Sequence, residues 1–145
     1  ERAYGVLELH DDEHGKIRAA GETALDAMQC REESRLSPKI LTQQMITGVD
    51  PHHSMLINRM RHGQMLLEGD TLLVLEVHPA GYAYLASNEA EKHSPIQVLE
   101  ITGFGAFGRV YLGGGEEEIR CAAEAMERAL AQVKGRPNET SEQHL

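Results

Sequence analysis

The sequence predicts an α/β sandwich, in which helices pack on a sheet. Strand-like apolar runs alternate along its 145 residues with segments in which apolar residues recur every three or four positions. The chain also repeats itself: Ala-Tyr-Gly at residues 3–5 and Ala-Phe-Gly at residues 106–108 are each followed by an apolar stretch and then by a helical segment containing Ile-Arg. A shared order of bend, strand and helix at both ends indicates an internal repeat.

The first copy of the repeat predicts a strand at residues 6–10, a turn at 11–15 and a helix at 17–28. The helix is indicated by apolar or small residues spaced along one face, from Ile17 to Met28. The charged segment that follows ends in Ser-Pro-Lys and predicts a linker over residues 31–39. This linker is the best candidate for a domain boundary.

The rest of the chain predicts four strands and three helices. Asp50 followed by Pro51 is a favourable helix start. The strands are expected at residues 40–49, 71–77, 96–101 and 110–112, and the helices at 51–61, 80–93 and 119–133. Gly135 and Pro137 end the last helix, and the polar residues 138–145 are expected to be loosely held.

Composition excludes several classes of function. The net charge of −9 and the absence of a Lys/Arg run argue against nucleic-acid binding, and the acidity favours solubility. No apolar run approaches the ~20 residues that span a membrane. Cys30 and Cys121 lack C-x-x-C spacing, which predicts reduced structural thiols in a cytosolic protein.

One motif and one cluster could carry chemistry, and both have simpler interpretations. Gly103-x-Gly105-x-x-Gly108 matches a dinucleotide-binding fingerprint, but such a fingerprint opens into a helix, and a strand is expected here. A tight bend that needs glycine is the better interpretation. His52 and His53 are neighbours at the start of a helix and point apart, so no metal site is expected. Without a catalytic constellation, neither an enzyme nor a cofactor is predicted.

Four strings in order carry a family resemblance: Leu56-Ile-Asn-Arg59, Pro79-Ala-Gly-Tyr82, Ala86-Ser-Asn-Glu-Ala-Glu-Lys92 and Gly105-Ala-Phe-Gly-Arg109. Together they resemble the tandem-domain, circularly permuted shell proteins of bacterial microcompartments, including carboxysomes. The resemblance implies that residues 1–35 are the last strand and helix of a truncated first shell domain. It implies that residues 36–135 form a complete second domain, followed by a polar tail at 136–145.

The resemblance also implies a function. Such a chain would be a structural, non-enzymatic shell protein, located in a microcompartment shell in the cytoplasm. Three chains would form a flat pseudohexamer whose central pore passes small metabolites. Two such discs could stack, and the tile would adjoin other shell hexamers and pentamers.

The resemblance further implies residue roles. Glu1 and Arg2 would form the pore gate, since arginine can bind a carboxylate in one state and release it in another. An exposed surface ion pair is the alternative for these two. The second bend would contribute Thr102, Gly103, Phe104 and Gly105 to the pore. Lys92 would contact its symmetry mate at the tile edge, or else be a helix-end lysine favoured by the helix dipole.

Two other functions remain open from the residues alone. One is a regulatory oligomer of similar architecture that binds a small molecule in the glycine bends. The other is a metal-dependent enzyme, for which the sequence offers the weaker case.

Overall fold

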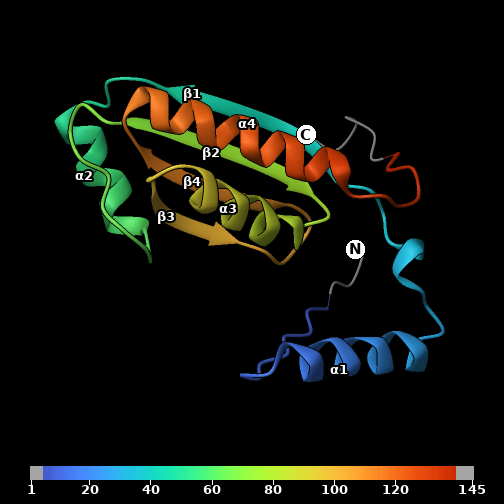
Figure 1. The fold of residues 1–145 in the computed structure, drawn as a ribbon. Helices are drawn as coiled ribbons and strands as arrows, with labels where there is room; N and C mark the ends of the chain where they lie inside the picture. Colours follow the sequence, from blue (N-terminus) through green and yellow to red (C-terminus); the bar gives the residue numbers. More distant parts are fainter. Residues whose placement is uncertain (1–4, 140–145) are drawn as a thin grey trace.

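The computed structural model describes residues 5–139, which contain a four-stranded antiparallel sheet with helices on both faces (Figure 1). The strands lie in the order β1-β2-β4-β3. Their bounds are Lys39–Ile46 for β1, Thr71–His78 for β2, Gln97–Thr102 for β3 and Gly108–Gly114 for β4. The α/β sandwich predicted from the sequence is confirmed.

Two helices, α3 (Tyr82–His93) and α4 (Glu116–Gln132), cover one face of the sheet. Three glutamates in the first turn of α4 suit the positive end of its dipole. Its buried face carries Ile119, Met126 and Leu130, at helical spacing. The buried residues of α3 are all small, including Ala83 and Ala86, so the two helices pack closely.

The other face of the sheet is covered in part by α2 (Pro51–Met60) and the loop after it. Asp50 caps this helix, accepting a hydrogen bond from the His52 amide at 2.8 Å. A second core cluster contains Val49, Leu66, Leu72 and Leu99. The helix start predicted from Asp50 and Pro51 is therefore confirmed.

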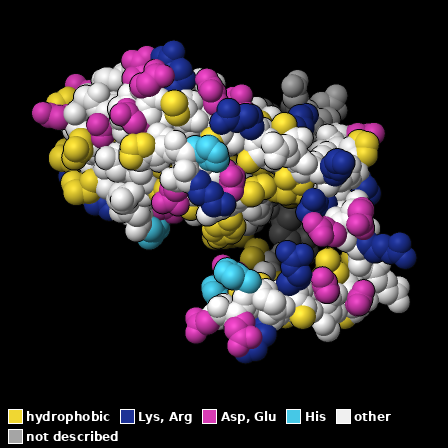
Figure 2. All heavy atoms as spheres, viewed as in Figure 1, with side chains coloured by type: hydrophobic (Ala, Val, Ile, Leu, Met, Phe, Trp, Pro, Cys, Tyr) yellow, Lys and Arg dark blue, Asp and Glu magenta, His cyan; other side chains and the backbone are white. Residues whose placement is uncertain are grey.

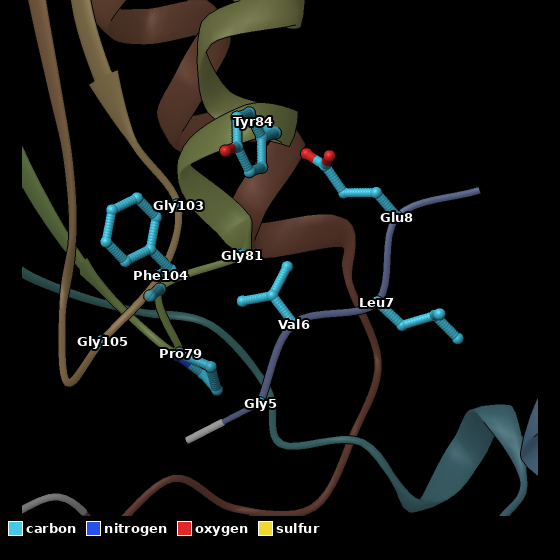
Figure 3. A pocket seen from close by; sticks show the side chains of 11 residues that line it. Gly5, Val6, Leu7, Glu8, Pro79, Gly81, Tyr84, Gly103, Phe104 and Gly105 are labelled. Atoms are coloured by element: carbon cyan, nitrogen blue, oxygen red, sulfur yellow. The ribbon is translucent and has the colours of Figure 1, made fainter. Parts of the chain in front are cut away.

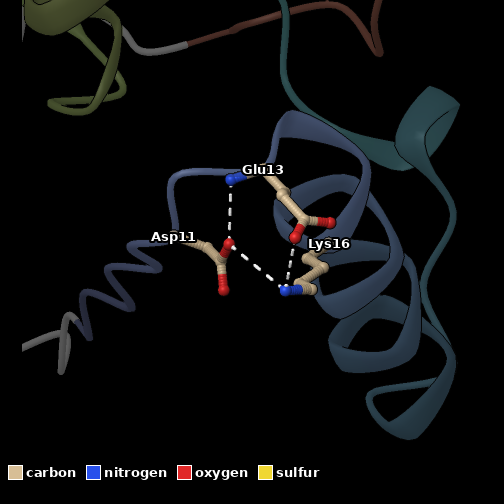
Figure 4. A network of polar contacts seen from close by, with 3 residues as sticks. All are labelled: Asp11, Glu13 and Lys16. Carbon is tan, nitrogen blue, oxygen red and sulfur yellow. Dashed lines mark hydrogen bonds and ion pairs between the residues drawn. The ribbon is translucent and has the colours of Figure 1, made fainter.

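The N-terminal segment differs from the prediction. Within residues 5–139 no strand precedes β1, so the strand expected at 6–10 is wrong for this chain. A strand needs a neighbouring strand to pair its backbone groups, and none lies beside these residues. The helix α1 (His14–Ala27) does form, after a polar turn in which Asp11 accepts from the Glu13 amide and Lys16 contacts both carboxylates (Figure 4).

The apolar face of α1 lacks a covering partner within the described chain. None of the fourteen residues of α1 is buried. The residues before it expose large apolar side chains, with Val6 at 58% and Leu7 at 66%. Figure 2 shows hydrophobic side chains at the surface where the main body faces α1.

The chain between α1 and β1 is clasped to the C-terminal segment. This linker includes the short helix η1 (Glu32–Ser34). Leu36 and Arg136 form a parallel bridge, and the Asn138 side-chain amide donates to the Ser37 carbonyl at 2.9 Å and to the His78 carbonyl at 3.0 Å. Asn138, expected in a loosely held tail, is thus tied to two other segments.

Within residues 5–139, no helix has both the length and the apolar composition that a membrane span requires.

Candidate functional site

Each glycine of the Gly103-x-Gly105-x-x-Gly108 bend meets a separate physical demand. Gly105 has φ +91°, which disfavours any side chain. A Cβ on Gly108 would overlap the Ala80 carbonyl oxygen and lie 2.9 Å from the Ala83 Cβ. A Cβ on Gly103 would overlap the Tyr84 ring. Since β4 and no helix follows, the tight-bend interpretation is confirmed and the dinucleotide fingerprint is not supported.

The bend forms one wall of a cavity of about 440 Å³ (Figure 3). The opposite wall is the N-terminal segment at residues 5–8, which begins at the glycine of the first Ala-aromatic-Gly. The lining residues are Gly5, Val6, Leu7, Glu8, Pro79, Ala80, Gly81, Tyr84, Gly103, Phe104 and Gly105. The structure thus brings residues that begin at the last glycine of the first Ala-aromatic-Gly, and residues that lead into the second one, to the same space.

The cavity is apolar apart from a few groups. Glu8 is the charged side chain among its lining residues, and Tyr84 carries a hydroxyl. Figure 3 shows the Glu8 carboxylate directed toward Tyr84, while Leu7 points away. Phe104 is 63% exposed at the tip of the bend. The lining thus combines an exposed aromatic ring with one carboxylate and one phenol hydroxyl.

Thr102 lies apart from the other predicted bend residues. It pairs with Arg109 at the end of β3 and lines a smaller cavity of about 200 Å³ on the α2 face of the sheet. Arg109 donates to Glu76 at 2.5 Å, and this hydrogen bond holds the pKa of the guanidinium above its ordinary value. Of the four predicted bend residues, the structure therefore brings three together at the larger cavity: Gly103, Phe104 and Gly105.

The remaining predicted residues are placed as follows. Glu1 and Arg2, the predicted gate, lie outside the described residues. Lys92 is in the last turn of α3, and its ammonium lies 2.6 Å from a Glu89 carboxylate oxygen. The Lys92 side chain is 57% exposed, so it is accessible to a neighbouring molecule.

No metal centre emerges from the described part of the chain. Between residues 5 and 139, no three or more His, Cys, Asp or Glu side chains lie close enough to hold an ion. His62 instead contacts Glu100 at 2.7 Å on the surface.

Sequence reasoning missed the Pro79–Gly81 turn and Tyr84 as parts of this site. Pro79–Gly81 directly precedes α3 and Tyr84 lies in its first turn, so both are distant in sequence from residues 5–8 and from the Gly103–Gly105 bend. The one available signal was the set of three glycines in the bend, because closely spaced glycines indicate a surface pressed against them.

Comparisons with known proteins agree with this fold, although no protein-family model matches the chain. Carboxysome shell protein CcmP of Synechococcus elongatus is 48% identical over 136 residues, covering 94% of this chain and 64% of that protein. The fused permuted hexameric shell protein MSM0275 from the RMM microcompartment is 45% identical, with a TM-score of 0.81. The double-ringed trimeric shell protein MSM0271 from the same microcompartment is 35% identical, with a TM-score of 0.83.

A four-stranded antiparallel sheet with this helix arrangement and these relatives defines a class: the chain has the fold of the shell proteins of bacterial microcompartments and is similar to them in sequence. Within that class, its relatives include carboxysome shell proteins, and its structural neighbours include permuted, fused shell proteins. The resemblance predicted from the sequence is confirmed. The match to MSM0271 covers 87% of this chain and 62% of MSM0271, and the match to MSM0275 covers 85% of this chain and 61% of MSM0275. The chain therefore spans less than two thirds of the length of each of these relatives.

Proposed function

We propose that this chain is part of a tile in a microcompartment shell, in which three copies surround a central opening that passes small metabolites. The proposal draws on its relatives, one of which is described as a double-ringed trimer and another as a fused hexamer. In such a tile, the bend of each repeat would face the opening. Three copies of two bends would then give six bends around one opening.

The observation that carries this proposal is the 440 Å³ cavity. Residues 5–8, which begin at the glycine of the first Ala-aromatic-Gly, and the bend at Gly103–Gly105 line the same space, although about a hundred residues separate them. In a ring built from tandem domains, the bends of both repeats would meet at one such space. The lining has few ionisable groups, which favours passive passage selected by size and polarity.

The exposed α1 supports the proposed domain division. Residues 1–35 would be the end of a first shell domain, in which residues 6–10 would pair as its last strand once the rest of that domain is present. Residues 36–135 would be the second domain, and residues 136–145 a tail. Val6 and Leu7, together with the half-buried Ile17 and Leu25 of α1, would then be covered by the rest of the first domain. Burial of such a face contributes roughly 25 cal/mol for each Å² removed from water.

The predicted gate and edge residues enter the tile as proposals. Glu1 and Arg2, just before the first bend, would open and close the passage by making and breaking an ion pair. Lys92 would reach the neighbouring tile from the end of α3, either by leaving Glu89 or by carrying that carboxylate into the contact. The role is structural rather than catalytic. Other shell hexamers and pentamers would be its partners, and stacked tiles could enclose a chamber.

The mass of the particle in solution tests the proposal. Mass photometry of the full-length product of the encoding gene should find trimers or multiples of trimers. A monomer at all concentrations would contradict the tile. A small molecule that raises the melting temperature saturably, without assembly, would instead favour the regulatory ligand-binding oligomer.

A further inference from the structure

We propose that Tyr84 is a positioning residue for the second bend: its ring fixes the place of Gly103 and forms a wall of the opening. The part that concerns the opening rests on the proposed function. The contact between Tyr84 and Gly103 does not, because it lies within a single chain.

Both ends of the bend pack against residues 80–84, at the turn that leads into α3. At the first end, a Cβ at Gly103 would lie 2.6 Å from Tyr84 Cδ2 and Cζ, and closer still to Cε2. At the second end, Gly108 lies against the Ala80 carbonyl and the Ala83 methyl. The backbone of the bend therefore packs so closely on residues 80–84 that a side chain at Gly103 or Gly108 would overlap them.

The glycine at position 103 is required by Tyr84 rather than by the backbone. Gly103 is buried and does not have the positive φ that Gly105 has. Alanine would be compatible with its backbone conformation, so the obstacle is the aromatic ring. Tyr84 and Gly103 are thus a matched pair, in which a large side chain occupies the space that a missing one leaves.

Tyr84 also borders the cavity directly. It is 45% exposed, so one part of the ring packs on Gly103 while another part faces the open space (Figure 3). Truncation of this side chain would widen the cavity and remove the support of the bend. Phenylalanine would keep the support and remove the hydroxyl alone.

A double-mutant cycle on the purified chain tests the pairing. Gly103→Ala should lower the free energy of unfolding of the wild-type chain, and should lower it much less in a chain that already carries Tyr84→Ala. We expect the two changes to couple by about fivefold or more in the unfolding equilibrium constant. Gly81→Ala is the matched control: Gly81 lines the same cavity, but a Cβ there would meet no atom within 4 Å. Additive effects of Gly103→Ala and Tyr84→Ala would overturn the pairing.

Cryo-electron microscopy of assembled tiles tests the positioning role. The bend at 103–107 should be displaced or poorly defined in Tyr84→Ala and unchanged in Tyr84→Phe. A Tyr84→Ala tile whose bend superposes on the wild-type bend would overturn the proposal. If the wild-type protein forms no ring, the proposed function fails, and the double-mutant cycle still decides the contact between Tyr84 and Gly103.

Discussion

Asn58 joins α2 to the loop behind it through both ends of its side-chain amide. Its Nδ2 donates to the Leu66 carbonyl at 2.8 Å, and its Oδ1 accepts from the Leu66 amide at 2.9 Å. Leu66 is 1% exposed, so water cannot replace these hydrogen bonds without local opening. One side chain thus holds the loop that completes the second core cluster.

Asn58→Ala should therefore lower the free energy of unfolding by about 1–3 kcal/mol, since it leaves buried backbone groups unpaired. Urea denaturation followed by circular dichroism measures this. Asn88→Ala, on the exposed side of α3, is the control and should change stability by less than about 0.5 kcal/mol. Equal effects of the two substitutions would show that the Leu66 contact is unimportant.

The Glu89–Lys92 pair predicts a pH dependence. The hydrogen bond from Lys92 holds the pKa of Glu89 below its ordinary value of 4.5. A carboxyl group whose pKa is lower in the folded state than in the unfolded state stabilises the fold at pH values above its ordinary pKa. This contribution is lost as the pH falls through the folded-state pKa. Lys92→Met should raise the Glu89 pKa, as read from the titration of its side-chain carbon by NMR. Lys16→Met, in the distant Lys16–Glu13 pair, should leave the Glu89 pKa unchanged.

At the scale of elements, α1 is held by its own hydrogen bonds and by little packing. An isolated helix of this length is marginal in water. Hydrogen exchange followed by mass spectrometry should therefore find α1 exchanging far faster than β2 and β4, the central strands of the sheet. Protection of α1 equal to that of the central strands in the monomeric chain would contradict its lack of a covering partner.

The clasp between the linker and the C-terminal segment makes a separate prediction. Asn138→Ala removes two hydrogen bonds to backbone carbonyls and should cost about 1–2 kcal/mol of unfolding free energy. It should also speed hydrogen exchange at residues 34–37. Glu139→Ala, at the next and exposed position, provides the comparison. No change in exchange at the linker would argue against a clasp.

The elements predicted well from the sequence are those whose signal is local. Asp50-Pro51 marked the start of α2, and the apolar spacing of Ile119, Met126 and Leu130 marked the buried face of α4. The strand expected at residues 6–10 failed because pairing depends on a neighbour that the sequence pattern does not reveal. The contact of Tyr84 with Gly103 was also invisible, since it depends on how α3 meets the bend in three dimensions.

At the scale of the whole molecule, the described chain carries surfaces that the tile would cover. One side of α1 and the apolar residues before it lack a packing partner among residues 5–139. Residues 5–8, at the end of the first repeated motif, share a cavity with the bend at Gly103–Gly105. In the proposed tile, the rest of the first domain would cover α1, and each of the three chains would supply two bends to the opening.

The most direct measurement is cryo-electron microscopy of the full-length product of the encoding gene at moderate concentration. We expect three-fold discs with a central hole, and the bends at Gly103–Gly105 at the rim of that hole. Compact particles without a hole, or discs whose bends lie away from the centre, would contradict the proposal that this chain forms a shell tile.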